Sequence, residues 1–232
     1  IGEEASKVFR NLAVQQLTEE SDRMLVAPLR FKSVLLDEMD HVIAAARMGR
    51  PASMILKNNS ISDRDIILKL QEASCAGVRI DMIVRGICCV RAGVPGKTEN
   101  LHIRSLVGRY LEHTRIYRFG CGEDADLFLS SADFITRNTE RRVEVACPIL
   151  DPELRRRVFH ITDVLISDNV KARQLAPDGL WRPRENGAPP CSSQEVFQRE
   201  AEEEAEQLLQ HTPRSSRKES PWRRLLERLG RA

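Results

Sequence analysis

The sequence lacks a long apolar run and carries almost no excess of charge of one sign. No stretch approaches the roughly 20 apolar residues that a transmembrane helix needs, so we expect a chain that does not span a membrane. The 36 basic and 34 acidic residues give a formal net charge of +2, a balance that predicts no nucleic-acid partner. Any site for an anion must therefore be local.

Cysteine is present, but its spacing shows no metal-binding pattern. The six cysteines form no C-x-x-C pair, and none stands at a histidine spacing typical of zinc ligands. We interpret them as reduced, mostly buried thiols of a cytoplasmic protein. The chain opens on Ile1-Gly2-Glu3-Glu4, without a basic leader or an initiator methionine, and we expect it to be part of something longer.

Two amphipathic helices are predicted near the N-terminus. Apolar residues at helical spacing indicate a helix from Glu3 to about Glu20, which would end a preceding domain. A second apolar stripe predicts a helix that follows Pro28 and stops before Pro51, with His41 exposed on it.

The next segment has the pattern of a strand, a helix and a strand. Residues 54–56 and 78–84 are short apolar runs, and Ser62 with Asp65 forms a capping box that predicts the start of the helix between them. A unit of this size is typical of a parallel crossover. The predicted fold class is therefore α/β.

Further strands and a closing helix complete the predicted domain. Alternating polar and apolar residues predict strands at 101–107, 114–119, 126–130 and 142–147, which together indicate a mixed sheet. Asp151-Pro152-Glu153 is a typical helix start. The buried face of this helix is predicted to consist of Leu154, Val158, Ile161 and Leu165.

The composition changes near Gly179, where prolines and serines precede a segment rich in Glu and Ala. We predict three parts: the C-terminal helix of a preceding domain (1–22), a mixed sheet flanked by helices (23–178), and a low-complexity charged tail (179–232). The tail is expected to be mostly disordered, with short helices at 194–210 and 221–229.

Polar residues directly follow two of the predicted strands. In open α/β sheets, ligands bind beyond the carboxyl ends of parallel strands. Lys57 and Asn59 follow the first of these strands and Arg85 the second, which would place cations and an amide where phosphate oxygens could bind. The alternative is that they are ordinary charges at strand ends. Gly86 would allow close approach of a bound group, or serve a plain turn.

The segment from 110 to 117 places a histidine two residues before an arginine. On a strand, this spacing would put His113 and Arg115 on the same face. Such an imidazole could donate to a phosphate, protonate a leaving oxygen or be phosphorylated itself, with the guanidinium stabilising negative charge. A purely structural histidine is the alternative.

A polar loop follows the strand that ends at Ser130. It contains Ser131, Asp133, Arg137 and Asn138, and the nearby Arg142 and Glu144 would share one strand face. Ser131 and Asn138 could instead cap local turns. The sequence has no Walker loop, no G-x-G-x-x-G and no D-x-D pair for magnesium, so phosphate handling would depend on side-chain cations and a histidine.

These residues fall in long blocks that resemble the C-terminal region of the large, histidine-dependent polyphosphate kinases. The blocks read LKNNSISDRDIILKLQEASCAGVRIDMIVRGICCV, YLEHTRIYRF, LFLSSADFITRNTERRVEVACPILDPELRRRV and ISDNVKAR. The resemblance covers roughly residues 1–175. It implies a phospholipase-D-like domain, one of two that face each other across a shared site.

The resemblance also implies an activity and roles for particular residues. The family transfers the terminal phosphate of ATP reversibly to polyphosphate through a phosphohistidine, with Mg²⁺ present. His113 matches the second family histidine and Arg85 a ligand of the nucleotide phosphates. Arg142 and Glu144 match active-site positions. Lys57, Asn59, Arg115, Ser131, Asp133, Arg137 and Asn138 are further expected phosphate-binding residues.

Other family features would lie upstream of Ile1. The phosphate-accepting histidine and the Mg²⁺-associated arginines match nothing in this chain, so no metal ligand is predicted here and the isolated chain is expected to be inactive. The complete enzyme is expected to be a homo-oligomer that includes the N-terminal domains. Two alternatives remain: a non-catalytic module that binds polyphosphate or nucleotide, and an interaction scaffold that acts through the tail.

Overall fold

A mixed β-sheet forms the centre of the first of two compact units, Ile1–Ser193 and Gln194–Ala232. The computed structural model describes residues 1–17 and 22–211. In these residues the sheet has nine strands in the order β1-β7-β6-β5-β2-β3-β4-β8-β9. Their bounds are β1 Leu25–Ala27, β2 Ser53–Asn58, β3 Arg79–Val84, β4 Leu101–Leu106, β5 Arg115–Phe119, β6 Asp126–Ser130, β7 Glu144–Pro148, β8 Ala172–Leu175 and β9 Trp181–Pro183.

The central strands β2, β3 and β4 are parallel, and the remaining pairings are antiparallel. The predicted mixed α/β sheet is confirmed. Because β2 and β3 are in parallel register with Asn58 opposite Val84, their carboxyl ends lie side by side. The residues that follow these two strands are therefore neighbours.

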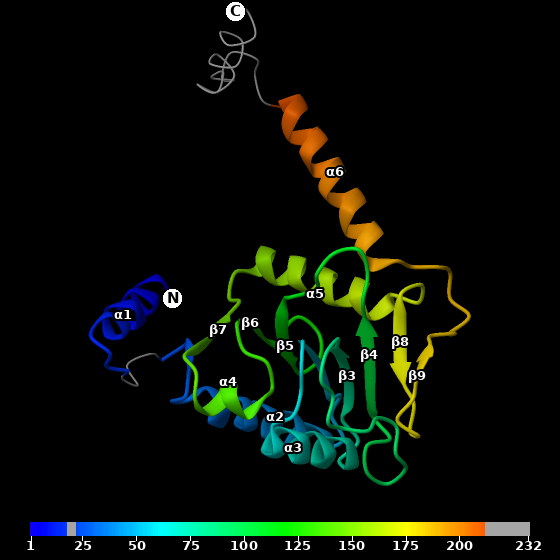
Figure 1. Cartoon of the computed structure of the whole chain (residues 1–232), viewed down its shortest axis with the longest axis horizontal. Coiled ribbons are helices and arrows are strands. Elements are labelled where there is room, and N and C mark those ends of the chain that lie inside the picture. The colour runs from blue at the N-terminus through cyan, green and yellow to red at the C-terminus, as the bar shows by residue number, and fades with distance from the viewer. Residues whose placement is uncertain (18–21, 212–232) are drawn as a thin grey trace, which may run out of the picture. The chain divides into compact units, whose positions relative to one another are not determined.

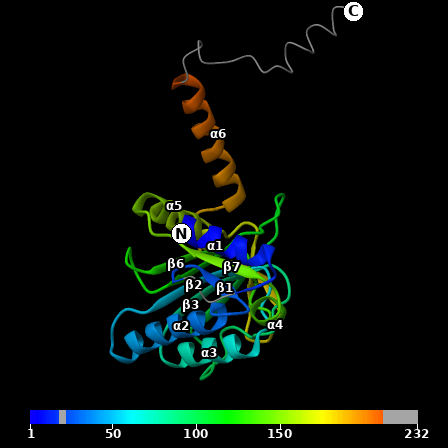
Figure 2. The same ribbon diagram turned by 90° about the vertical axis from the view of Figure 1, so that its left-hand side faces the viewer.

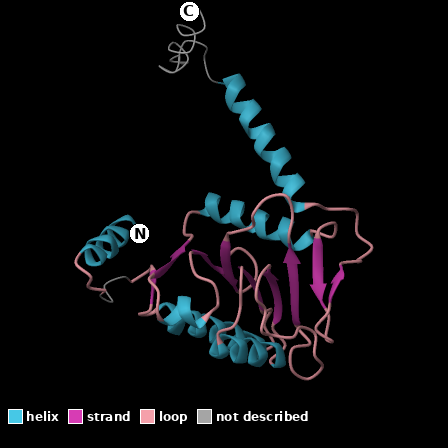
Figure 3. Cartoon of the chain, viewed as in Figure 1, coloured by secondary structure: helices cyan, strands magenta, loops and turns pink. Residues whose placement is uncertain are grey.

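Helices cover both faces of the sheet, as Figures 1 and 2 show: α2 and α3 lie against one face and α5 against the other. The helices are α1 Gly2–Ala13, α2 Phe31–Arg47, α3 Arg64–Cys75, α4 Thr136–Glu140, α5 Pro152–Ser167 and α6 Ser193–His211. Figure 3 shows the strands between α5 on one side and α2 and α3 on the other. Among the helices that the structure describes, none combines the length and apolar character needed to cross a membrane.

The main core lies between the sheet and the pair α2 and α3. Met54 and Leu56 of β2 are fully buried there, as the alternation of a strand requires. The rings of Phe31, Tyr117 and Phe134 pack together, with centroids 6.4 Å apart for the first two and 4.8 Å for the last two. This aromatic cluster supports the strands beside the candidate site.

Three local predictions are wrong. The first helix ends at Ala13, well before Glu20, and none of its side chains is buried. The helix α3 is capped by Asp63, whose carboxylate accepts hydrogen bonds from the backbone N–H groups of Asp65 and Ile66, so Ser62 is not the cap. Leu154 is 53% exposed and does not contribute to the buried face of α5.

The cysteines also differ from the prediction. All six are free thiols, but three are exposed and three are half-buried. By contrast, the exposed position of His41 on α2 is confirmed, with its side chain 79% exposed.

The boundary predicted at residue 179 falls inside the first compact unit, which runs to Ser193. β9 adds to the sheet beyond this point by pairing with β8. The chain then returns to α5, where the Asp168 carboxylate accepts hydrogen bonds from the Ser193 N–H and hydroxyl at 2.8 and 2.7 Å. The helix predicted at 194–210 is confirmed as α6, and the one predicted at 221–229 lies outside the described residues.

Candidate functional site

The carboxyl ends of β2 and β3 bring Asn59 and Arg85 together. The Nε atom of Arg85 donates to Asn59 Oδ1 at 2.7 Å and to the carbonyl oxygen of Glu112 at 2.9 Å. The guanidinium is thus joined to the segment that leads into β5. The predicted juxtaposition of these strand-end residues is present in the structure.

Gly86 allows the close approach of another backbone segment rather than of a bound group. A Cβ atom at this position would lie 2.8 Å from the Asn59 carbonyl oxygen, which accepts a hydrogen bond from the Gly86 N–H. The close approach is therefore between two backbone segments. It holds the ends of β2 and β3 together.

Lys57 is the most deeply buried cation near this end of the sheet, with 1% of its side chain exposed. Its ammonium donates to the Thr114 carbonyl oxygen at 2.8 Å and lies 3.6 Å from a Glu112 carboxylate oxygen. Burial lowers the pKa of Lys57, and Arg85 and Arg115 act in the same direction, whereas Glu112 opposes them. Lys57 therefore supports the segment that carries His113.

His113 contacts Arg115, but not by the predicted strand geometry. β5 begins only at Arg115, so His113 lies in the preceding loop, where its side chain is exposed. Arg115 Nη1 lies 2.9 Å from His113 Nδ1 and 3.3 Å from Nε2, and it also donates to the His113 carbonyl oxygen at 2.9 Å. The guanidinium folds back on the loop and fixes the histidine beside it.

Asp133 holds Arg115 in this position. Its two carboxylate oxygens accept from Arg115 Nε at 3.1 Å and Nη2 at 3.0 Å, which is a bidentate pair. One of these oxygens also accepts from the Asn59 backbone N–H at 2.6 Å. We call this connected set the His113 cluster: Lys57, Asn59, Arg85, Glu112, His113, Arg115 and Asp133.

A second set of polar residues surrounds the buried carboxylate of Glu144. Its oxygens accept hydrogen bonds from Ser131 Oγ and from Asn138 Nδ2, each at 2.5 Å. Arg142 Nε lies 3.8 Å from the same carboxylate and is 57% exposed on its side chain. We call Ser131, Asn138, Arg142 and Glu144 the Glu144 cluster.

The two clusters are joined by one side chain. Asn138 Oδ1 accepts a 3.4 Å hydrogen bond from the Asp133 N–H, while its Nδ2 donates to Glu144. Arg137, which was predicted with these residues, is exposed on α4 and is not among the contacts that join them. The alternative in which Ser131 and Asn138 only cap turns does not describe their contacts with Glu144.

Glu112 was not predicted as a site residue, although it contacts Lys57 and its carbonyl accepts from Arg85. Its only sequence signal is its position next to His113. Residues 109–114 form a loop rather than a strand. The alternation of side chains along a strand therefore could not predict which way the Glu112 side chain points.

The described residues contain no group of three or more His, Cys, Asp or Glu side chains that could hold a metal ion. Within the clusters, the Asp133 and Glu144 carboxylates already accept bonds from cations, amides and hydroxyls.

The fold and the two clusters define a class: a mixed α/β domain with a polar site at the carboxyl ends of its parallel strands. Residues 24–194 match the family described as polyphosphate kinase C-terminal domain 2. The chain belongs to the polyphosphate kinase family, and the resemblance predicted from the sequence blocks is confirmed.

Individual relatives agree with this assignment. The chain is 40% identical over 214 residues to a polyphosphate kinase from Staphylococcus saprophyticus, with 92% of this chain and 30% of that protein covered. It is 43% identical over 174 residues to polyphosphate kinase 1 from Chlorobaculum tepidum, with 75% and 25% covered. The crystal structure of the Porphyromonas gingivalis enzyme superimposes with a TM-score of 0.81 at 33% identity, covering 87% of this chain and 31% of that chain.

The chain thus spans about 30% of the length of the curated relatives it matches. A phospholipase D family member, Nuc from Salmonella typhimurium, is a more remote structural neighbour, with a TM-score of 0.46 and 14% identity. This likeness is too distant to support a conclusion about the chain.

Proposed function

We propose that this chain supplies one side of the active site in an enzyme that transfers the terminal phosphate of ATP reversibly to polyphosphate. In the forward direction, the bond between the γ-phosphorus and the bridging oxygen of ATP breaks, and a phosphorus–nitrogen bond forms on a histidine in the N-terminal part. That bond then breaks as a terminal oxygen of polyphosphate takes the phosphoryl group. ADP is the other product.

The contact between His113 and Arg115 is the observation that carries this proposal. An arginine has only donors, so the His113 nitrogen that faces Nη1 must accept. Because His113 is exposed, its ring can reach the phosphate oxygens of a substrate and act there as an acid or base.

The surrounding cations suit the charge of a phosphate chain. Arg85 uses Nε for both of its described hydrogen bonds, and we propose that its terminal nitrogens bind phosphate oxygens. Arg142 is largely exposed beside Glu144, so its guanidinium can also bind phosphate oxygens. Held by carboxylates and carbonyls, these cations would stabilise a transferring phosphoryl group without rearrangement.

The chain on its own is proposed to be inactive, because the histidine that takes up phosphate lies in the N-terminal part. ATP would arrive with Mg²⁺, whose positive charge would offset the negative charge of the phosphates. The protein ligands of Mg²⁺ would lie in the same N-terminal part. We also propose that the complete enzyme is a homo-oligomer and acts in the cytoplasm.

The experiment that tests this function follows label from γ-labelled ATP into acid-insoluble polymer. Three proteins would be assayed in the presence of Mg²⁺. They are the chain by itself, its fusion to the N-terminal domains of the Staphylococcus saprophyticus relative, and the same fusion with His113→Ala. His41→Ala is the matched control, since His41 is an exposed histidine outside both clusters.

We expect polymer from the fusion and from its His41→Ala variant, and roughly a hundredfold less or none from His113→Ala, as is typical of a lost acid–base group. A fusion that binds polyphosphate but makes no polymer would contradict transferase activity. It would favour the non-catalytic binding module.

A further inference from the structure

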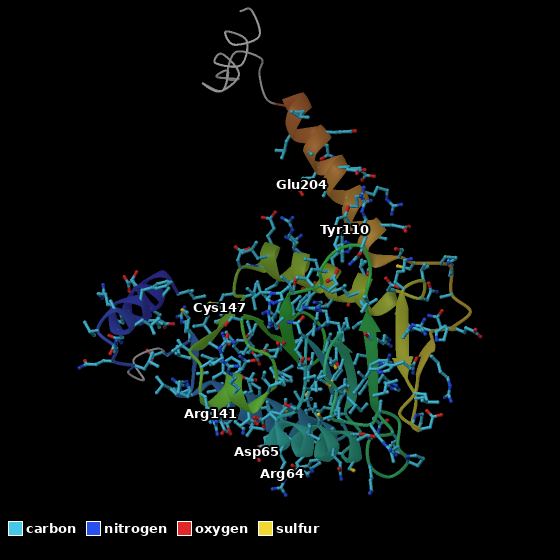
Figure 4. All side chains as sticks on the ribbon, in the orientation of Figure 1. Arg64, Asp65, Tyr110, Arg141, Cys147 and Glu204 are labelled. Atoms are coloured by element: carbon cyan, nitrogen blue, oxygen red, sulfur yellow. The ribbon has the colours of Figure 1, made fainter. Side chains whose placement is uncertain are left out.

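Lys32, in the first turn of α2, makes ion pairs with carboxylates from two other helices. Its ammonium nitrogen lies 3.1 Å from Asp63 Oδ2, 2.6 Å from Asp65 Oδ2 and 2.6 Å from Glu140 Oε1. Asp63 and Asp65 stand at the start of α3, and Glu140 is the last residue of α4. Figure 4 labels Asp65, one of these partners on α3, and Arg141, which directly follows α4.

The helix that Lys32 holds is too short to be stable by itself. α4 has five residues and no side-chain cap at Ile135, whereas isolated helices need about 12–15 residues to be even marginally stable. Tertiary contacts at its C-terminal end hold it instead. Thr139 Oγ1 donates to Asp63 Oδ2 at 2.8 Å. The Lys32 ammonium, which pairs with the same Asp63 oxygen, donates to Glu140 Oε1.

α4 carries the residue that joins the two clusters. This residue is Asn138, which directly precedes Thr139. Its side chain donates to Glu144 and accepts from the Asp133 backbone N–H. A shift of this single turn would move the Asn138 amide away from both partners. It would alter the orientation of Glu144 and the support of Asp133, and through them Arg142, Arg115 and His113.

We propose that Lys32 is a positioning residue for phosphoryl transfer, acting through Glu140, Asp63 and α4 on Asn138. Lys32 lies outside both clusters and binds no phosphate in this assignment. The inference rests on the proposed function, because its effect on rate requires that the two clusters carry out transfer. Its physical basis is the ion cluster itself.

The charges needed for this arrangement are present at neutral pH. Partial burial lowers the pKa of Lys32, but the hydrogen bonds to Asp65, Glu140 and Asp63 together raise it above its usual value. The same contact holds the pKa of Asp65 below its usual value. With only 16% of its side chain exposed, Lys32 is shielded from solvent more than an ordinary surface cation.

The chain offers a closely matched control in Lys69. Its ammonium lies 2.7 Å from Asp40 and 3.0 Å from Glu72, and its side chain is 20% exposed. These contacts join α3 to α2 without involving α4. Lys32→Met and Lys69→Met therefore remove similar interactions, but only the first removes a support of Asn138.

The test measures polymer synthesis by the complete fusion enzyme with Lys32→Met, Lys69→Met, Asn138→Ala and the double variant Lys32→Met with Asn138→Ala. We expect Lys32→Met to lower kcat roughly tenfold or more with a small change in KM for ATP, as misplacement of reacting groups does. Lys69→Met should change kcat less than about twofold. The double variant should be no slower than Asn138→Ala, because both act through one residue.

Each other result has a distinct meaning. No polymer from the unaltered fusion would overturn the proposed function before Lys32 is tested. An active fusion in which Lys32→Met equals Lys69→Met, or in which its effect multiplies with that of Asn138→Ala, would overturn the positioning role.

Should Lys32→Met fail to fold, Glu140→Gln serves in its place. Glu140 is 47% exposed, so its replacement disturbs the fold less while it still removes the tie to α4. The expected result is the same: a lower kcat and no added effect on top of Asn138→Ala. Effects that multiply would again overturn the inference.

Discussion

Lys57 shows how a single buried charge can connect the site to the stability of the fold. Its side chain is 1% exposed, and its ammonium binds a backbone carbonyl of the loop that carries His113. Burial is the main reason for its lowered pKa. The folded protein therefore binds this proton less tightly than the unfolded chain does, for which 10.5 is the reference value.

The pH dependence of stability tests this description of Lys57. Between the lowered folded pKa and about 10.5, the unfolded chain binds more protons, so the free energy of unfolding should rise with pH. Lys57→Met lacks this proton. We therefore expect the wild-type chain to gain stability relative to Lys57→Met as pH increases towards this value, as measured by urea unfolding at several pH values.

The comparison with the variant isolates the Lys57 proton. Burial raises the pKa of Tyr117, which favours unfolding at high pH, but this residue is present in both proteins and cancels in the difference. Parallel stability curves for the two proteins would show that Lys57 titrates alike in the folded and unfolded states.

At the scale of elements, α5 shows how a local cap supports one face of the sheet. The Asp151 carboxylate accepts from the backbone N–H groups of Glu153 and Leu154, each at 2.9 Å. The helix then packs Val158 against Ile116 and Leu127 of the sheet. Pro152 fits the first turn because its missing N–H would have no partner there.

We predict that Asp151→Ala lowers the free energy of unfolding by about 1 kcal/mol, the usual cost of a lost N-cap. Asp151→Asn should be nearly neutral, since Asn caps about as well as Asp. Urea unfolding followed by circular dichroism measures both. Equal losses in the two variants would attribute the effect to the charge of Asp151 rather than to its hydrogen bonds.

At the scale of the whole molecule, the boundary of the folded unit decides which truncations are tolerated. β9 and the residues up to Ser193 belong with the sheet, since β9 pairs with β8 and Ser193 binds the buried Asp168 carboxylate. Arg184 also donates to the Asp168 carbonyl oxygen at 2.9 Å. A chain ending at 178 would lack the bonds from Arg184 and Ser193 to Asp168 and would leave the β9 side of β8 unpaired.

We therefore expect a chain of residues 1–193 to unfold cooperatively with a urea midpoint close to that of all 232 residues. A chain of residues 1–178 should unfold at a clearly lower urea concentration, because it loses a strand and the bonds to Asp168. Equal midpoints for the two truncated chains would show that β9 and the following segment add no stability.

Much of the fold was predictable from local patterns. The alternation of polar and apolar residues predicted β4, β5 and β6 to within one residue at each end. The Asp151-Pro152-Glu153 signal marked the start of α5. The site was predicted less completely. Asn59, Arg85, His113, Arg115 and Asp133 do come together, but the bond between Asp133 and Arg115 spans 18 residues, and the strand period proposed for His113 does not apply.

The sequence by itself determined the class of the fold and the family, because the periodicity of each element and the long blocks of matching residues are local properties of the chain. Tertiary structure alone decided how the site is supported. Asp63 rather than Ser62 caps α3, and the same carboxylate binds Thr139, 76 positions away. Such contacts leave no local pattern, since they depend on which elements the fold brings together.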